Sequence, residues 1–96
     1  MIVKIHKTDD GRLILAVCDS ELIGKKFEEG NKQLDLDSDF YKGEEKTEKE
    51  TADLMRNSYI LNIVGEKSVG LAIKEGLANK ETINRISQVP YAQIII

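Results

Sequence analysis

Residues 2–18 of the chain read IVKIHKTDDGRLILAVC, and this stretch decides how the fold begins. Polar and apolar side chains alternate over Ile2–His6, whereas Leu13–Cys18 is an unbroken apolar run. Asp9–Gly11 between them supplies the chemistry of a tight turn, so the stretch predicts a β-hairpin. Because a strand that is apolar on both faces is typical of a buried position, we expect the second strand to lie inside a sheet.

The next segment, residues 19–33, is expected to be irregular, with Gly24 and Gly30 interrupting it. A third strand is predicted over 34–37, with leucines pointing inward and aspartates outward. Exposed acids of this kind suit the edge of a sheet, because charge discourages pairing with another chain.

The first helix is predicted from Glu48 to Val64. Thr47 precedes this helix and Glu50 lies within it, and the two residues have the spacing of a capping box. In a capping box, each side chain bonds the free backbone N–H of the other residue. The apolar residues that follow fall at helical spacing. The β-branched stretch 59–64 is also compatible with a strand, and this alternative stays open.

A second helix is predicted over 66–75, between a break at Gly65 and a left-handed cap at Gly76. Two strands, 82–86 and 91–96, then complete the chain. The resulting order β-β-β-α-α-β-β predicts an α+β fold with a small mixed sheet, an N-terminal hairpin, two consecutive helices and C-terminal strands. A length of 96 residues fits a single domain over 1–96.

The overall charge narrows the class of partner. The formal net charge is −3 and the sequence pI is about 5.2, whereas a domain that binds a phosphate backbone over a broad surface is usually basic. The single cysteine excludes an intramolecular disulfide, and no apolar run approaches the roughly 18 residues of a membrane span. We therefore expect a cytoplasmic protein without a membrane partner.

The sequence predicts no catalytic, cofactor-binding or metal site. His6 is the only histidine, and one histidine with one cysteine supplies too few ligands for a zinc site of the usual nitrogen and sulfur type. Asp35-x-Asp37-x-Asp39 superficially suggests a calcium loop, but Phe40 and Lys46 occupy the positions of its glycine and bidentate glutamate. These acids are better interpreted as a solvated edge.

Cys18 and Asp19 form the alternative candidate site, together with Lys25 and the turn Asn62–Glu66. A reactive thiol needs a lowered pKa, which neighbouring lysines would favour and the adjacent carboxylate opposes. A small enzyme or ligand-binding protein built on these residues is therefore the second hypothesis, behind a buried structural cysteine.

A local basic loop is the main candidate for binding. Gly24, Lys25, Lys26 and Lys32 concentrate positive charge in an otherwise acidic chain. The loop lacks the spacing of a phosphate-binding P-loop. A Gly-Lys-Lys turn can nevertheless offer backbone N–H groups and positive charge together to an anion.

Three segments carry a resemblance to a known family: AVCDSELIGKKFEEG at 16–30, NIVGEKSVGLAIKEGL at 62–77 and VPYAQI at 89–94. Together they resemble an archaeal family of small single-domain proteins classed as a domain of unknown function. The resemblance spans nearly the whole chain and implies a complete small protein. It implies no activity and no catalytic residues.

The function predicted from these observations is a non-enzymatic binding or accessory module. RNA or a ribonucleoprotein is the expected partner, with the translation machinery as the host, and a protein partner is the alternative. The contact surface would be the basic loop, extended by Lys4, Lys7 and Arg12 of the hairpin. If the loop is not the interface, the acidic residues 35–50 would instead contact a basic protein.

Overall fold

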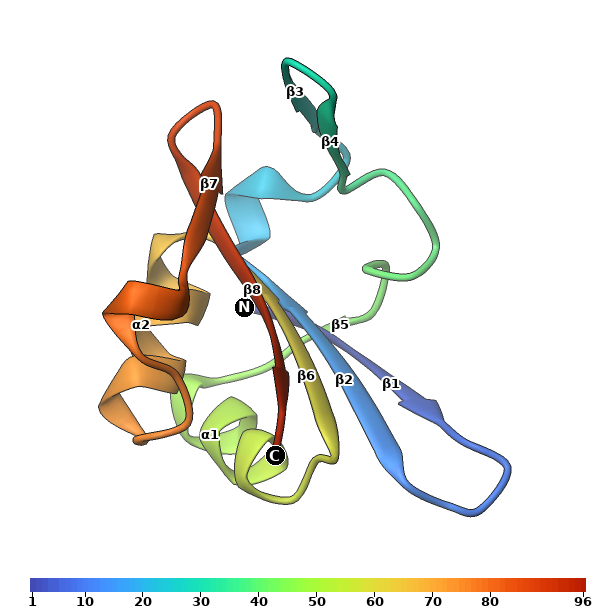
Figure 1. Ribbon diagram of the computed structural model, residues 1–96. Helices are drawn as coiled ribbons and strands as arrows, with labels where there is room; N and C mark the ends of the chain where they lie inside the picture. The colour runs from blue at the N-terminus through green and yellow to red at the C-terminus, as the bar shows by residue number, and fades with distance from the viewer.

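The computed structural model describes residues 1–96, and its centre is a mixed six-stranded sheet (Figure 1). All neighbouring strands are antiparallel except the central pair β2 and β6, which is parallel. In spatial order the strands are β5 (Glu44–Glu45), β1 (Ile2–Lys7), β2 (Leu13–Cys18), β6 (Ile60–Val64), β8 (Val89–Ile95) and β7 (Asn84–Ile86).

The N-terminal hairpin predicted from the sequence is confirmed. β1 and β2 pair in the register that joins Ile2 to Cys18 and Lys7 to Leu13. β2 lies inside the sheet between β1 and β6, and its residues from Leu15 to Cys18 are completely buried. The α+β class, the mixed sheet and the C-terminal strands are confirmed as well.

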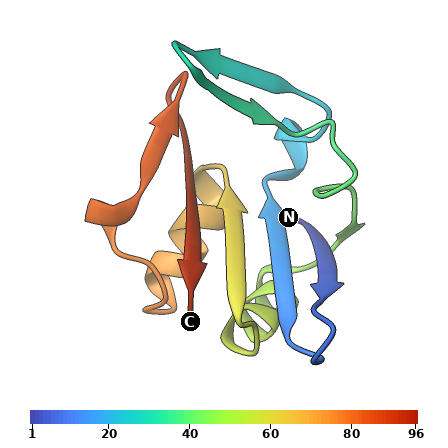
Figure 2. The ribbon, with the colours of Figure 1, turned by 45° about the vertical axis from the view of Figure 1, so that its right-hand side comes forward.

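Two nine-residue helices, α1 (Glu48–Arg56) and α2 (Glu66–Lys74), lie behind the sheet in Figure 2. α1 begins with the predicted capping box: the Glu50 backbone N–H donates to Thr47 Oγ1 at 3.1 Å, and the Thr47 N–H donates to Glu50 Oε1 at 3.0 Å. α2 ends at the predicted left-handed glycine, since Gly76 has φ +75°. The Leu77 N–H bonds to Ala72 O at 2.9 Å, which completes a Schellman motif.

The larger core lies between the helices and one face of the sheet. Since side chains alternate between the two faces of a strand, every second residue of β2 and β6 points to the helices. The buried members of this core are Val3, Leu15, Val17, Ala52, Met55, Leu61, Ile63, Val69, Leu71, Ala72 and Ala92.

The prediction of one long helix over 48–64 is wrong, and the alternative of a strand over 59–64 is correct. α1 ends at Arg56, and β6 follows after a short turn, so the two helices are not consecutive. The Tyr59 N–H donates to Leu13 O at 2.8 Å and starts the pairing with β2. β6 then pairs with β2 on one edge and β8 on the other, which satisfies its backbone and buries Ile63 completely.

The prediction of irregular structure over 19–33 is also wrong. A short 3-10 helix, η1 (Ser20–Leu22), is followed by a hairpin of β3 (Lys26–Glu29) and β4 (Lys32–Asp35), which form a separate two-stranded sheet. A two-residue Gly-Asn turn joins the strands, and Gly30 has φ +61°, as such turns require. The predicted third strand therefore begins and ends earlier than 34–37.

The β3–β4 hairpin covers part of the sheet face opposite the helices. Below it lies a smaller core of Cys18, Leu34, Leu36, Val64 and Ile86. At its tip the hairpin reaches the turn between β7 and β8 (Figure 2). There the Ser87 N–H donates to Glu29 Oε1 at 2.9 Å and its hydroxyl to Glu28 O at 3.0 Å.

The C-terminal part departs only slightly from expectation. A 3-10 helix, η2 (Lys80–Thr82), precedes β7, so β7 starts two residues later than predicted. Pro90 lies near the start of β8, as expected of a residue without an N–H. Neither helix is long and apolar enough to cross a membrane.

Candidate functional site

Asp19 follows β2 directly, and its carboxylate lies at the N-terminus of α2. Its Oδ1 accepts hydrogen bonds from the Ser68 backbone N–H at 2.8 Å and from the Ser68 hydroxyl at 2.7 Å. Its Oδ2 accepts one from the Lys67 N–H at 3.0 Å. These contacts make Asp19 the cap of α2, where its negative charge also complements the helix dipole.

Gly65 makes this capping possible. It occupies the N-cap position of α2, where a glycine has no side chain that could cap the helix. Its φ is +106°. A Cβ at position 65 would lie 2.2 Å from Cγ of Asp19, inside the space that the carboxylate fills. Glycine is required here by the backbone conformation and by this close approach together.

Cys18 is buried in the smaller core, and its Sγ donates to Asp19 O at 3.4 Å. Burial, together with the charges of Asp19 and Glu21, raises the pKa of the thiol from 9.0 to about 12. Since the thiolate is the nucleophilic form, this environment suppresses reactivity at neutral pH. The position supports a structural role for the cysteine.

The other residues of the alternative site do not meet around Cys18. Asn62 lies in the middle of β6 between Ala16 and Gln93 of the neighbouring strands. Glu66 pairs with Arg85, with Oε1 2.9 Å from Nη1. A hollow of about 190 Å³ lies beside Asp19, but neither the thiol nor Asn62 lines it.

His6 packs against the loop that precedes β5. Its ring stacks on Phe40 with centroids 4.5 Å apart, and Nε2 lies 3.0 Å from Phe40 O. In the acidic run, the Asp37 N–H donates to Asp35 Oδ1 at 2.9 Å, and Lys42 pairs with Asp37 at 3.3 Å. The structure places no three His, Cys, Asp or Glu side chains together as a metal site.

The basic loop is exposed, but its first two backbone N–H groups are already used. Gly24, with φ +88°, donates to Leu36 O at 2.9 Å, and Lys25 donates to Leu22 O at 3.1 Å. An anion at this turn would therefore meet side-chain charge and not a nest of free amides. Lys25, Lys26 and Lys32 are exposed, and the ion pairs of the structure involve other cations.

The hairpin divides these lysines between its two faces. Lys26 lies directly opposite Asp35, and Lys32 lies opposite Glu29. Residues directly opposite share a face, and successive residues alternate, so Lys26 and Lys32 point to different sides. Lys26 therefore forms one part of the candidate surface, and Lys32 at the tip forms another.

The structure does not join the hairpin β1–β2 to this surface. Arg12 lies in the β1–β2 turn, at the opposite end of the sheet from β3 and β4 (Figures 1 and 2). Its guanidinium pairs with Asp10 at 3.1 Å and lies 4.4 Å from the Tyr59 ring centre. Lys7 is at the same end, so Lys7 and Arg12 do not adjoin Lys25.

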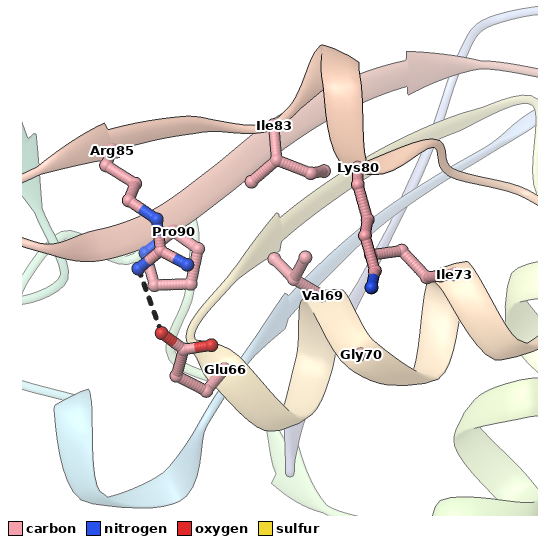
Figure 3. Close-up of a pocket in the computed structure, with 8 residues that line it drawn as sticks. All are labelled: Glu66, Val69, Gly70, Ile73, Lys80, Ile83, Arg85 and Pro90. Carbon is pink, nitrogen blue, oxygen red and sulfur yellow. Dashed lines mark hydrogen bonds and ion pairs between the residues drawn. The ribbon is translucent and has the colours of Figure 1, made fainter.

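A groove of about 420 Å³ separates α2 from the strand pair β7–β8 and was not found from the sequence. In Figure 3, Glu66 and Arg85 pair at one end, and Lys80 lies beside Ile73 at the other. Val69, Ile83 and Pro90 supply apolar surface between these ends. The only feature of the sequence that could have indicated this groove is Gly70, a glycine in the interior of a helix.

The fold and these surfaces define a class of protein: a small α+β domain with a helix-covered mixed sheet and a second hairpin over the other face. Within that class, the chain belongs to the family described as proteins of unknown function, DUF424, whose model matches residues 6–96. The family predicted from three sequence segments is thereby confirmed.

The chain is similar in structure to an uncharacterized conserved protein from Methanopyrus kandleri, known from a crystal structure. The TM-score is 0.84 at 26% sequence identity, over 99% of this chain and 90% of the other. No curated protein matches the chain.

Proposed function

We propose that this protein is a non-enzymatic binding module, one domain over residues 1–96, that acts in the cytoplasm on a ribonucleoprotein. The translation machinery is the proposed host. One observation carries the proposal: the β3–β4 hairpin and the turn before it present three exposed lysines, Lys25, Lys26 and Lys32, that form no ion pair within the protein. Their charges are free for phosphates of an RNA.

The hairpin also carries acids, which favours an assembled particle over free RNA. Glu28, Glu29 and Asp35 balance the three lysines, and the whole chain has a net charge of −3. Long-range attraction to naked RNA is therefore weak. A particle that presents phosphates beside basic protein side chains would satisfy both kinds of charge.

The test is a triple variant in which Lys25, Lys26 and Lys32 become glutamine. A matched control changes Lys49, Lys67 and Lys74, which lie on the helices, so both proteins lose the same charge. Co-sedimentation of each purified protein with ribosomal particles is measured across a salt series. Each lost contact with single-stranded RNA should lower the salt slope by about 0.7, and three contacts by about 2.

We expect the hairpin variant to leave the particles at lower salt than the wild-type protein, while the control variant follows the wild-type curve. Equal release of all three proteins would contradict the proposal and would direct attention to residues 35–50 with a basic protein as partner. Thermal melting of both variants, which should match the wild type, excludes unfolding as the cause.

The alternative function, a small enzyme at Cys18, Asp19 and Lys25, has less support. The Asp19 carboxylate is occupied by three hydrogen bonds to α2. The raised pKa of Cys18 opposes the thiolate that nucleophilic catalysis needs.

A further inference from the structure

The groove between α2 and β7–β8 combines an aliphatic floor with two cations. Val69, Ile73 and Ile83 line it, Lys80 stands at one end, and Arg85 stands at the other (Figure 3). Hydrogen bonds to Glu66 Oε1 and Gln88 O, both at 2.9 Å, hold Arg85 in place. Lys80 forms no ion pair, so its charge has no partner within the protein.

Gly70 keeps the middle of this groove open. Glycine inside a helix is less stable than alanine because it loses more backbone freedom on folding. No packing reason explains it here: a Cβ at position 70 would meet nothing within 4 Å, and the residue has no positive φ. A side chain at this position would instead fill the groove, which points to an occupant.

We propose that the groove binds a segment of a partner protein in which aliphatic residues alternate with Asp or Glu. Aliphatic side chains would cover the floor between Val69 and Ile83, and a carboxylate would reach Lys80. Glu66 is already paired with Arg85, so it does not repel such a segment. An RNA has no aliphatic groups for this floor, and Lys80 is the only cation in the groove that is unpaired and could meet its phosphates.

The site is separate from the hairpin lysines proposed above as the ribonucleoprotein contact. Lysines 25, 26 and 32 do not line the groove, so a variant of one surface leaves the other intact. Failure of either proposal is therefore visible independently of the other.

The test is an NMR titration of the full chain labelled with ¹⁵N. The probe is a pool of acetylated, amidated hexapeptides in which Ile, Leu or Val alternates with Asp or Glu. A second pool carries Lys and Arg in place of the acids, and isovalerate serves as a small aliphatic carboxylate. We expect the acidic pool to shift amide signals of α2, Ile83 and Arg85, and the basic pool to leave them unchanged.

Two variants decide whether the groove is the site. Gly70→Leu fills the groove and improves the helix, so its Tm should rise by about 4 °C while the peptide shifts disappear. Lys80→Gln should weaken binding about two- to fivefold, as expected for one exposed ion pair. Lys74→Gln, at an exposed residue of α2 that does not line the groove, is the control and should bind as the wild type does.

Several outcomes would overturn the proposal. These are shifts in Gly70→Leu equal to those of the wild type, equal shifts with the basic pool, or no shift with either pool. Isovalerate binding as tightly as the peptides would assign the groove to a small acid. Self-association that Gly70→Leu abolishes would assign it to a second copy of this chain.

Discussion

Single residues of this protein show that a reactive site suggested by the sequence can be interpreted only once the fold is known. Cys18 and Asp19 are adjacent, and beside nearby lysines they resembled parts of a reactive site. The structure joins Asp19 to Ser68 and Lys67, which are remote in sequence. Nothing local in the sequence indicates that contact, because the approach depends on how β2 and β6 pair.

Replacing Asp19 by alanine should destabilise the protein. The change leaves the Lys67 N–H, which is partly buried, and the Ser68 N–H, which is buried, without their acceptor, which costs about 1–3 kcal/mol. Urea denaturation measures the loss. Asp39→Ala is the control, because that exposed side chain forms no hydrogen bond or ion pair, and its stability should stay within about 0.5 kcal/mol of wild type. Equal stability of the two variants would refute the capping role.

Stability should fall at alkaline pH because of the buried Cys18 and the partly buried Tyr41. Burial raises the pKa of Cys18 from 9.0 to about 12 and that of Tyr41 from 10.0 to about 12. When the pKa of such a group is higher in the folded than in the unfolded protein, its contribution to stability is complete below the unfolded pKa. That contribution is lost as the pH rises toward the folded pKa. Melting curves between pH 8 and about 12 should show this decline, and Cys18→Ala should make it shallower. If the stability of Cys18→Ala depended on pH as that of the wild type does, the contribution of Cys18 would be refuted.

At the scale of elements, local signals were reliable wherever a single turn or cap determined the structure. The Thr47–Glu50 box, the Gly65 break and the Gly76 cap were all found in the sequence. The strand Ile60–Val64 was predicted only as the alternative to a helix, because its apolar residues continue the helical spacing of Ala52 and Met55. Pairing with β2 and β8 decides its conformation, and that pairing is not local.

The missed hairpin β3–β4 has a different cause. Only Phe27 and Leu34 pack into the smaller core, so the strands show little apolar alternation. The Gly30–Asn31 pair between them was the usable signal, since Gly-Asn is a favoured two-residue turn. The groove beside α2 could not be predicted, because it depends on the distance between α2 and β7.

Ile63→Ala should test the assignment of β6. Ile63 is completely buried between both helices and the sheet, so the truncation leaves a cavity and should cost about 2–4 kcal/mol. Ile95→Ala is the matched control on the neighbouring strand, where the side chain is 69% exposed, and should cost below about 0.5 kcal/mol. Chemical denaturation of both variants gives the comparison, and similar losses would show that β6 is placed wrongly.

At the scale of the whole molecule, the sheet carries a core on each face. β2 and β6 belong to both: Val17 and Ile63 face the helices, while Cys18 and Val64 face the β3–β4 hairpin. Because both cores share these two strands, loss of packing on one face should also lower the stability of the core on the other face. We therefore expect the two cores to unfold in one transition.

Leu36→Ala should test this coupling. Leu36 is completely buried in the smaller core, and its truncation should lower the unfolding free energy by about 2–4 kcal/mol. Hydrogen exchange should then accelerate in α1 and α2 as well as in the hairpin. Faster exchange confined to residues 25–36 with an unchanged Tm would show that the hairpin opens by itself.

The parallel pairing of β2 with β6 has a consequence for how the chain acquires this structure. Ile14 pairs with Ile60, and the hairpin β3–β4 and α1 lie between these two residues in the sequence. The centre of the sheet can therefore form only when two strands that are far apart in the sequence come together. Pairing so far apart in sequence slows folding, because the loop entropy is lost before the contacts form. During synthesis β2 emerges before β6, and its run LILAVC has only β1 beside it. That interval, when an apolar strand still has an open edge, is the period in which the nascent chain is most prone to aggregate.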